Sequence, residues 1–186
     1  MSRASPTPRR AGLSVPVGKV ALAVAIGSMT LLFAALASAY VVRMGLGSWT
    51  SIRLIGFPVV WLSTLALATA SMLLVFARRR VLHEELGAAR KALWAAGGAG
   101  CLFVLGQVFL WIQLQGLGFV VATNPASSFF YLITAIHGVH VLAGLVALFW
   151  TSARLDRGAV PVEVTGLYWH FLLAVWLGFF GLMLVT

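Results

Sequence analysis

Long stretches without a charged residue dominate this chain. They cover residues 20–42, 54–77, 92–153 and 164–186. The third stretch is too long for one helix, and Thr123-Asn124-Pro125-Ala126-Ser127-Ser128, a cluster of turn-forming residues, divides it in two. A helix needs roughly 20 apolar residues to cross about 30 Å of hydrocarbon. The pattern therefore predicts five membrane-spanning helices, near residues 20–42, 55–77, 92–115, 129–151 and 166–185.

The composition agrees with an all-α integral membrane protein. Of the 186 residues, 61% are hydrophobic and only 9% are charged, whereas a soluble domain carries about 25% charged residues. This excludes a soluble enzyme. The net charge of +9 does not indicate a nucleic-acid partner, because the basic residues separate apolar runs instead of forming one polar face. We expect a flexible cytoplasmic segment at 1–19 and a single membrane domain at 20–186.

The basic residues predict the orientation. If the N-terminus is inside, eleven Lys and Arg residues lie inside and two, Arg43 and Arg53, lie outside. Five of the inside residues (Arg78, Arg79, Arg80, Arg90 and Lys91) are expected in the second loop. The positive-inside rule then gives N-in and C-out in a bacterial inner membrane. The first span also resembles a signal peptide with an Ala37-Ser38-Ala39 cleavage site, but its apolar run of about 23 residues exceeds the usual h-region, which favours an uncleaved helix.

Polar side chains at membrane depth are costly and therefore mark candidate functional positions. They are Gln107, Gln113, Gln115, His137, His140, Glu163 and His170. No carboxylate lies deep in a span, which argues against an ion-coupled transporter. His137 and His140 share a helix face, but His170 lies about 10 Å away in depth by helical rise, so one metal ion cannot join them. Two interpretations remain: hydrogen bonds between helices, which we favour, or a haem held by His137 or His140.

Two further groups predict how the helices meet. Glycines near the third and fourth spans (Gly97, Gly98, Gly100, Gly138 and Gly144) favour close helix contact. Glu163 and His170 are seven residues apart, on one face of the last helix, and we expect them to pair. That cluster would anchor the helix or hold a lipid headgroup, with Tyr168 and Trp169 in an interfacial aromatic belt.

Several of these residues form motifs of a known family. His137-Gly138-Val139-His140-Val141, followed by Gly144, resembles the HG-x-HV segment of haem–copper oxidase subunit III. Glu163, followed by Tyr168-Trp169-His170-Phe171 and Trp176, resembles the last-helix signature of that family. Gly106, Phe109 and Gln113 resemble its G-x-x-F-x-x-x-Q pattern. The family usually has acidic residues where this chain has Gly116 and Leu173, so the expectation rests on packing and lipid binding and not on proton handling.

The resemblance implies the short five-helix bacterial form of this subunit. Such a chain binds no haem or copper itself, packs against oxidase subunits I and II, which carry those groups, and holds phospholipid. The complex reduces oxygen to water with electrons from cytochrome c or quinol. The residues implied in structure or lipid binding are His137, Gly138, His140, Glu163, Trp169 and His170, and Gln107 and Gln113 form a polar seam between helices. Two alternatives stay open: an accessory protein of a nitric oxide reductase, and a free-standing membrane b-type haem protein.

Overall fold

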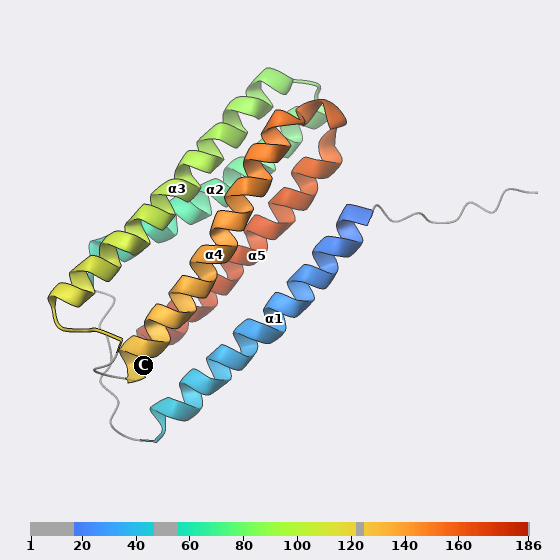
Figure 1. Ribbon diagram of the computed structural model, residues 1–186. Helices are drawn as coiled ribbons and strands as arrows, with labels where there is room; N and C mark the ends of the chain where they lie inside the picture. The colour runs from blue at the N-terminus through green and yellow to red at the C-terminus, as the bar shows by residue number, and fades with distance from the viewer. Residues whose placement is uncertain (1–16, 47–55, 122–124, 186) are drawn as a thin grey trace, which may run out of the picture.

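The computed structural model describes residues 17–46, 56–121 and 125–185, and all its long elements are helices (Figure 1). In chain order they are α1 (Val17–Met44), α2 (Pro58–Leu82), α3 (Leu86–Gly116), α4 (Pro125–Ala153), the short 3₁₀ helix η2 (Leu155–Arg157) and α5 (Ala159–Val185). Each of the five α-helices is long and apolar enough to cross a membrane. The predicted all-α architecture with five spans is confirmed. Of the segment expected to be flexible, residues 1–16 lie outside the described residues, and Val17 already begins α1.

The helices extend beyond the apolar runs that predicted them. α2 continues through Arg78, Arg79 and Arg80 to Leu82, and α3 begins at Leu86, before Arg90 and Lys91. The expectation that these five cations fill a loop is therefore wrong, since only residues 83–85 separate the two helices. Arginine and lysine are good helix formers, so the backbone ladder continues after the hydrophobic stretch has ended.

Proline and glycine set several of the ends. Pro58 lies in the first turn of α2 and Pro125 begins α4, positions at which the missing N–H of proline costs nothing. Gly158 has a φ of 88° between η2 and α5, a left-handed conformation that glycine adopts without strain. This turn lets α5 begin at Ala159, seven residues before the predicted start at 166, so Glu163 lies within the helix.

The five helices divide into a compact unit and an outer helix. α2, α3, α4 and α5 pack side by side, and α1 lies outside them, against α4 and α5 (Figure 1). Only 11% of the most apolar window of α1 is buried, against 33–39% in the other four helices. Phe33 and Tyr40 are among its few buried side chains.

Alternating helix directions gather most of the cations at one end of the bundle. This end, here called the basic end, contains Lys19, Arg78, Arg79, Arg80, Arg90, Lys91, Arg154 and Arg157. It is formed by the start of α1, the α2–α3 turn and the α4–η2–α5 connection, which lie together in Figure 1. The opposite end carries Arg43, the last-turn cation of α1.

Glycines bring the helices of the compact unit close together, as the sequence predicted. A Cβ added at Gly97 would lie 2.9 Å from the ring of Phe149, and one at Gly100 would overlap the ring of Trp169. Gly144 is also tightly covered, with Tyr168 3.1 Å from such an atom. The prediction is wrong for Gly98 and Gly138, where an added Cβ would meet nothing within 4 Å.

Candidate functional site

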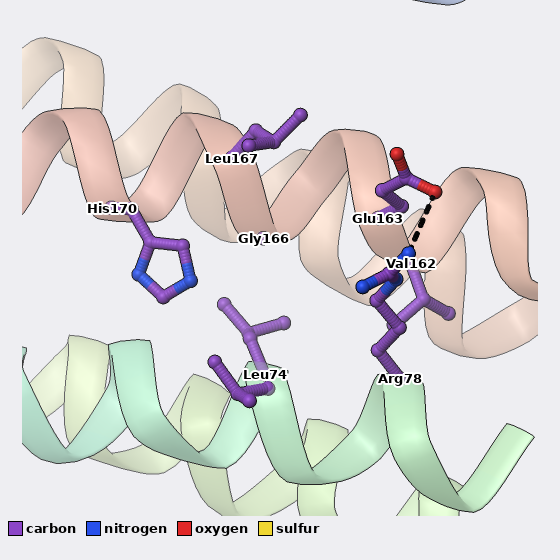
Figure 2. Close-up of a pocket in the computed structure, with 8 residues that line it drawn as sticks. Leu74, Arg78, Val162, Glu163, Gly166, Leu167 and His170 are labelled. Atoms are coloured by element: carbon purple, nitrogen blue, oxygen red, sulfur yellow. Dashed lines mark hydrogen bonds and ion pairs between the residues drawn. The ribbon is translucent and has the colours of Figure 1, made fainter.

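Glu163 ties three helices together at the basic end. Its Oε1 accepts a hydrogen bond from Lys19 Nζ of α1 at 2.7 Å, and its Oε2 accepts one from Arg78 Nη2 of α2 at 3.3 Å. Figure 2 shows Arg78 reaching from α2 toward the carboxylate on α5. We call this group the Glu163 clamp. Both cations lie at the apolar boundary, where long side chains direct their charged ends toward a polar partner or water.

The expected pairing of Glu163 with His170 is wrong. Two helical turns separate them, about 10 Å of rise, and each side chain reaches a neighbouring helix instead. His170 Nδ1 hydrogen-bonds to Ser71 Oγ of α2. Between the two contacts lies a cavity of about 100 Å³, lined by Leu74 and Arg78 from α2 and by Gly166 and other residues of α5 (Figure 2).

Trp169 is a core residue of the bundle. Its exposed fraction is 0%, it occupies the space left by Gly100, and its Nε1 donates to the carbonyl oxygen of Gly144 at 3.3 Å. The neighbouring Tyr168 donates its hydroxyl to the carbonyl oxygen of His140 at 2.9 Å. The interpretation of Trp169 as part of an interfacial belt is therefore wrong, because its ring is buried between α3, α4 and α5. Tyr168 is half-buried and joins α5 to α4.

His137 lies in a cage of aromatic rings. Its ring centroid is 6.2 Å from that of Phe33 on α1, 5.7 Å from Phe103 on α3 and 5.6 Å from Trp176 on α5. Neither ring nitrogen has a hydrogen-bond partner among the described residues. The expectation that this histidine hydrogen-bonds to another helix is wrong; it contacts three helices through its ring.

His140 makes its polar contact within its own helix. Its Nδ1 lies 2.7 Å from the carbonyl oxygen of Ile136, and its ring centroid lies 5.7 Å from that of Phe33. Phe33 therefore contacts both histidines of the HG-x-HV segment. α1 rests on this segment through ring packing and not through hydrogen bonds to the imidazoles.

Gln107 and Gln113 were predicted to form a polar seam between helices, and one of them, Gln107, makes such a contact. Gln107 of α3 donates through Nε2 to Ser63 Oγ of α2 at 2.8 Å, which is the expected bond between helices. Gln113 is half-buried in the last turns of α3 and takes part in no side-chain hydrogen bond that joins the described helices.

Sequence reasoning missed the hydroxyl partners of this seam. Trp176 Nε1 donates to Thr64 Oγ1 at 2.9 Å, and Trp111 Nε1 donates to Thr134 Oγ1 at 3.1 Å. Thr151 and Thr165 join α4 to α5 at 2.9 Å. The available signal was the presence of serine and threonine inside apolar spans, where such side chains hydrogen-bond across helices.

The side chains that could bind a metal ion are dispersed. Across the described ranges, no group of three or more His, Cys, Asp or Glu side chains is placed to hold a metal ion. Glu163 is engaged by Lys19 and Arg78, whereas His140 is engaged by Ile136 and His170 by Ser71.

Comparison with known proteins identifies the family of this chain. The family described as "Cytochrome c oxidase subunit III" matches residues 10–185. A protein named cytochrome c oxidase subunit 3 from Thermostichus vulcanus is 27% identical, over 85% of this chain and 82% of that protein. The protein of the same name from Bacillus subtilis (strain 168) is 27% identical, over 83% and 79%. A shorter match, 36% identical over 44% of this chain and 43% of the relative, is to a probable cytochrome c oxidase subunit 3 from Mycobacterium leprae. This chain belongs to the cytochrome c oxidase subunit III family.

Proposed function

We propose that this protein is the accessory subunit III of a respiratory haem–copper terminal oxidase, assembled with subunits I and II. Those subunits supply the haem and copper and reduce oxygen to water. The observation that carries the proposal is the use of the family-motif residues for packing: Glu163, Trp169 and His170 each bind a neighbouring helix. A chain whose motif residues hold its helices in place is suited to present a fixed surface to a catalytic partner.

The charge at the basic end supports an orientation in the membrane. That end carries eight Lys and Arg residues, against Arg43 at the other end of the described helices. Cytoplasmic loops and helix ends carry an excess of Lys and Arg, which supports an N-in, C-out chain in a bacterial inner membrane. The basic end then meets anionic headgroups of the cytoplasmic leaflet, at about 1 kcal/mol for each cation near the surface.

The cavity between α2 and α5 supports a phospholipid site. Its wall combines apolar side chains such as Leu74 and Leu167 with the half-exposed guanidinium of Arg78 at the basic end. This order matches a lipid, with an acyl chain along the apolar wall and a phosphate that competes for Arg78 with Glu163, whose carboxylate also lines the cavity. Arg78→Gln should lower the amount of anionic phospholipid retained by the purified protein in native mass spectrometry. Arg79→Gln is the matched control, because Arg79 is exposed and does not line this cavity; equal loss from both variants would contradict the site.

Purification of the tagged chain in mild detergent tests the whole proposal. We expect a large haem-bearing partner to co-elute, with a reduced-minus-oxidised haem spectrum and oxygen consumption by the complex. Nitric oxide consumption without oxygen consumption would assign the chain to a reductase instead. A colourless chain that elutes alone would contradict assembly with an oxidase, and a Soret band from the isolated chain would support the free-standing haem protein.

A further inference from the structure

Two arginines share one indole ring where α4 ends at the basic end. The Cζ atom of Arg154 lies 4.6 Å from the ring centroid of Trp150, and that of Arg157 lies 5.9 Å from the same centroid. A guanidinium at either distance is attracted to the face of the ring. We call Arg154 and Arg157 the arginine pair. The indole gathers their two positive charges at one point of the surface, on α4 and η2.

The connection between α4 and α5 fixes the backbone of the arginine pair. Leu155, which lies between the two arginines, is 1% exposed and anchors η2 in the bundle. Arg157 donates its backbone N–H to the carbonyl oxygen of Arg154 at 3.1 Å, and Gly158 donates its own to that of Leu155 at 3.3 Å. A ligand of the pair therefore meets side chains on an ordered turn, which lowers the entropy cost of binding.

The arginine pair has no carboxylate partner. The cations of the Glu163 clamp pair with that carboxylate, and Arg80 pairs with Glu85. Within the described ranges, neither Arg154 nor Arg157 takes part in an ion pair, and the exposed Asp156 between them pairs with neither. Two like charges held beside one ring repel each other. An anion between them would be attracted by both and would relieve that repulsion.

The surface of α4 beyond the arginine pair is apolar and suits an acyl chain. Trp150 is 50% exposed, and Val146, Leu142 and Val139 are exposed as well. These residues follow one another at intervals of four, four and three positions, so they lie on one helix face that runs from the indole toward the middle of the span. We call this face the apolar stripe. Tryptophan at the end of a span is typical of the headgroup level of a membrane.

This combination favours a phospholipid over a free phosphate. Both ligands would use the guanidinium groups, which bind phosphate oxygens through parallel N–H donors. A phospholipid would in addition cover the indole and the apolar stripe. A headgroup with a cation of its own, such as choline, would be repelled by the second arginine, whereas an anionic headgroup would not.

We propose that the arginine pair binds the phosphate group of an anionic phospholipid, whose glycerol backbone lies beside Trp150 and whose acyl chain follows the apolar stripe. This site is separate from the cavity between α2 and α5, where Glu163 competes for Arg78. It requires only that the chain spans a membrane. The site therefore does not depend on assembly with an oxidase.

Lipid titration of the full chain, followed by native mass spectrometry, tests the site. The probes are dioleoyl-phosphatidylglycerol and dioleoyl-phosphatidylcholine, which have the same acyl chains. The double variant Arg154→Gln/Arg157→Gln should bind phosphatidylglycerol about tenfold more weakly than the wild type, the effect of losing one hydrogen bond to a charged group. Its affinity for phosphatidylcholine should change little.

A charge-matched control separates a specific site from diffuse attraction. Arg79→Gln/Arg90→Gln removes the same charge from the basic end, at exposed positions of α2 and α3. We expect this control to keep nearly the wild-type affinity for phosphatidylglycerol. Equal weakening in the two double variants would overturn the proposal, because it would mean that only the total charge of the basic end matters.

A second pair of variants tests the indole. Trp150→Leu keeps both arginines and an apolar surface but removes the ring, and it should weaken phosphatidylglycerol binding about threefold, the effect of a cation–π contact at an exposed site. Trp94→Leu is the matched control, because Trp94 is an exposed tryptophan of α3 whose ring contact is with Phe149. Equal affinities in these two variants would overturn the role of the indole in the site.

Inorganic phosphate distinguishes a lipid from a free anion. A preference for phosphatidylglycerol that persists in excess inorganic phosphate supports the lipid. Binding of inorganic phosphate that is lost in Arg154→Gln/Arg157→Gln, with no preference between the two lipids, would overturn the lipid assignment in favour of a free phosphate. Both arginines lie outside the buried core, so the variants should fold, and elution of each as a single species in detergent checks this.

Discussion

The outer helix α1 and the compact unit of α2–α5 are held by different kinds of contact. Within the unit, glycines allow rings and backbones to meet closely, as at Gly100 and Trp169, and hydroxyl groups join α2 to α3 and α5. α1 has one ion pair at the basic end, from Lys19, and ring contacts from Phe33 near its middle. Tyr40 adds a ring contact with Phe129 of α4, and most of the other side chains of α1 are exposed or half-buried.

This difference follows from the physics of helices in lipid. Lipid tails are as apolar as leucine, so apolar side chains gain little from leaving lipid, and stable contact needs close packing or polar bonds. The compact unit combines close packing with polar bonds, whereas α1 has its polar bond at Lys19 and its ring packing at Phe33, at separate points along its length. We therefore expect changes in the unit to affect the whole bundle and changes in α1 to detach a single helix. Four variants test this contrast, from the largest effect to the smallest.

Gly100→Val should give the largest effect. The new side chain would overlap the ring of Trp169 and approach Leu145, whose Cδ2 lies 3.0 Å from an added Cβ. Overpacking of this kind costs about 1–3 kcal/mol and occasionally more. Thermal unfolding of the purified protein in detergent measures it, with Gly98→Val as the matched control on the exposed side of α3. Equal melting temperatures for the two variants would mean that the α3–α5 contact is not tight.

Phe33→Ala should loosen α1 and leave the compact unit folded. The variant loses ring contacts with His137, His140 and Phe179. The cost should stay below the roughly 3–5 kcal/mol typical of aqueous cores, because lipid tails can occupy the vacated space. Spin labels at Val24 of α1 and Val146 of α4, both exposed, should report a broader distance distribution. Leu32→Ala, at an exposed position of α1, is the control and should leave the distribution narrow.

Glu163→Gln should detach α1 at the basic end alone. Both partners of the carboxylate lose their ion pair, while the contacts of Phe33 remain. Labels at Val20 and Leu167 should then separate more than labels near the middle of the helices. Because the pairs are partly exposed, the wild-type protein should approach the variant as salt is raised. Asp156→Asn removes an exposed carboxylate from the same end, and an equal separation in that variant would argue against a specific clamp.

Thr64→Val should give the smallest effect. It removes the acceptor for Trp176 Nε1 in the compact unit, and one such bond is worth about 0.6 kcal/mol on average. Thr69→Val is the matched control, because the hydroxyl of Thr69 bonds only to Leu65 on its own helix. A small loss of thermal stability is expected in the first variant and not in the second. Equal thermal stability of the two variants would mean that the indole of Trp176 stabilises the bundle through packing alone.

Hydropathy was sufficient to predict five helices, because each apolar run is long enough to span the membrane. The ends were harder to predict. The apolar run of α2 ends at Arg78, Arg79 and Arg80, but its helical backbone continues through them. The start of α5 depends on the turn at Gly158. The charged residues therefore indicate where the apolar run ends, whereas proline and glycine indicate where the helical backbone begins or ends.

The candidate site was predictable in its residues and not in its partners. The motif spacing identified His137, Glu163, Trp169 and His170. Which helix each of them contacts depends on the arrangement of helices, since residues such as Lys19 and Glu163 are 144 positions apart. The pairing of Glu163 with His170 was inferred from their spacing along one helix. It was wrong because each side chain bonds to a neighbouring helix instead.

That separation has a consequence for the order in which the protein is made. Glu163 is synthesised 144 residues after Lys19, so at about 5–20 residues per second the clamp waits on the order of 10 s for its carboxylate. The hairpin of α2 and α3, whose helices are consecutive, can form long before this. We therefore expect α1 to complete its contact with α5 only after α2, α3 and α4 have been made, so that this contact forms late in assembly of the bundle.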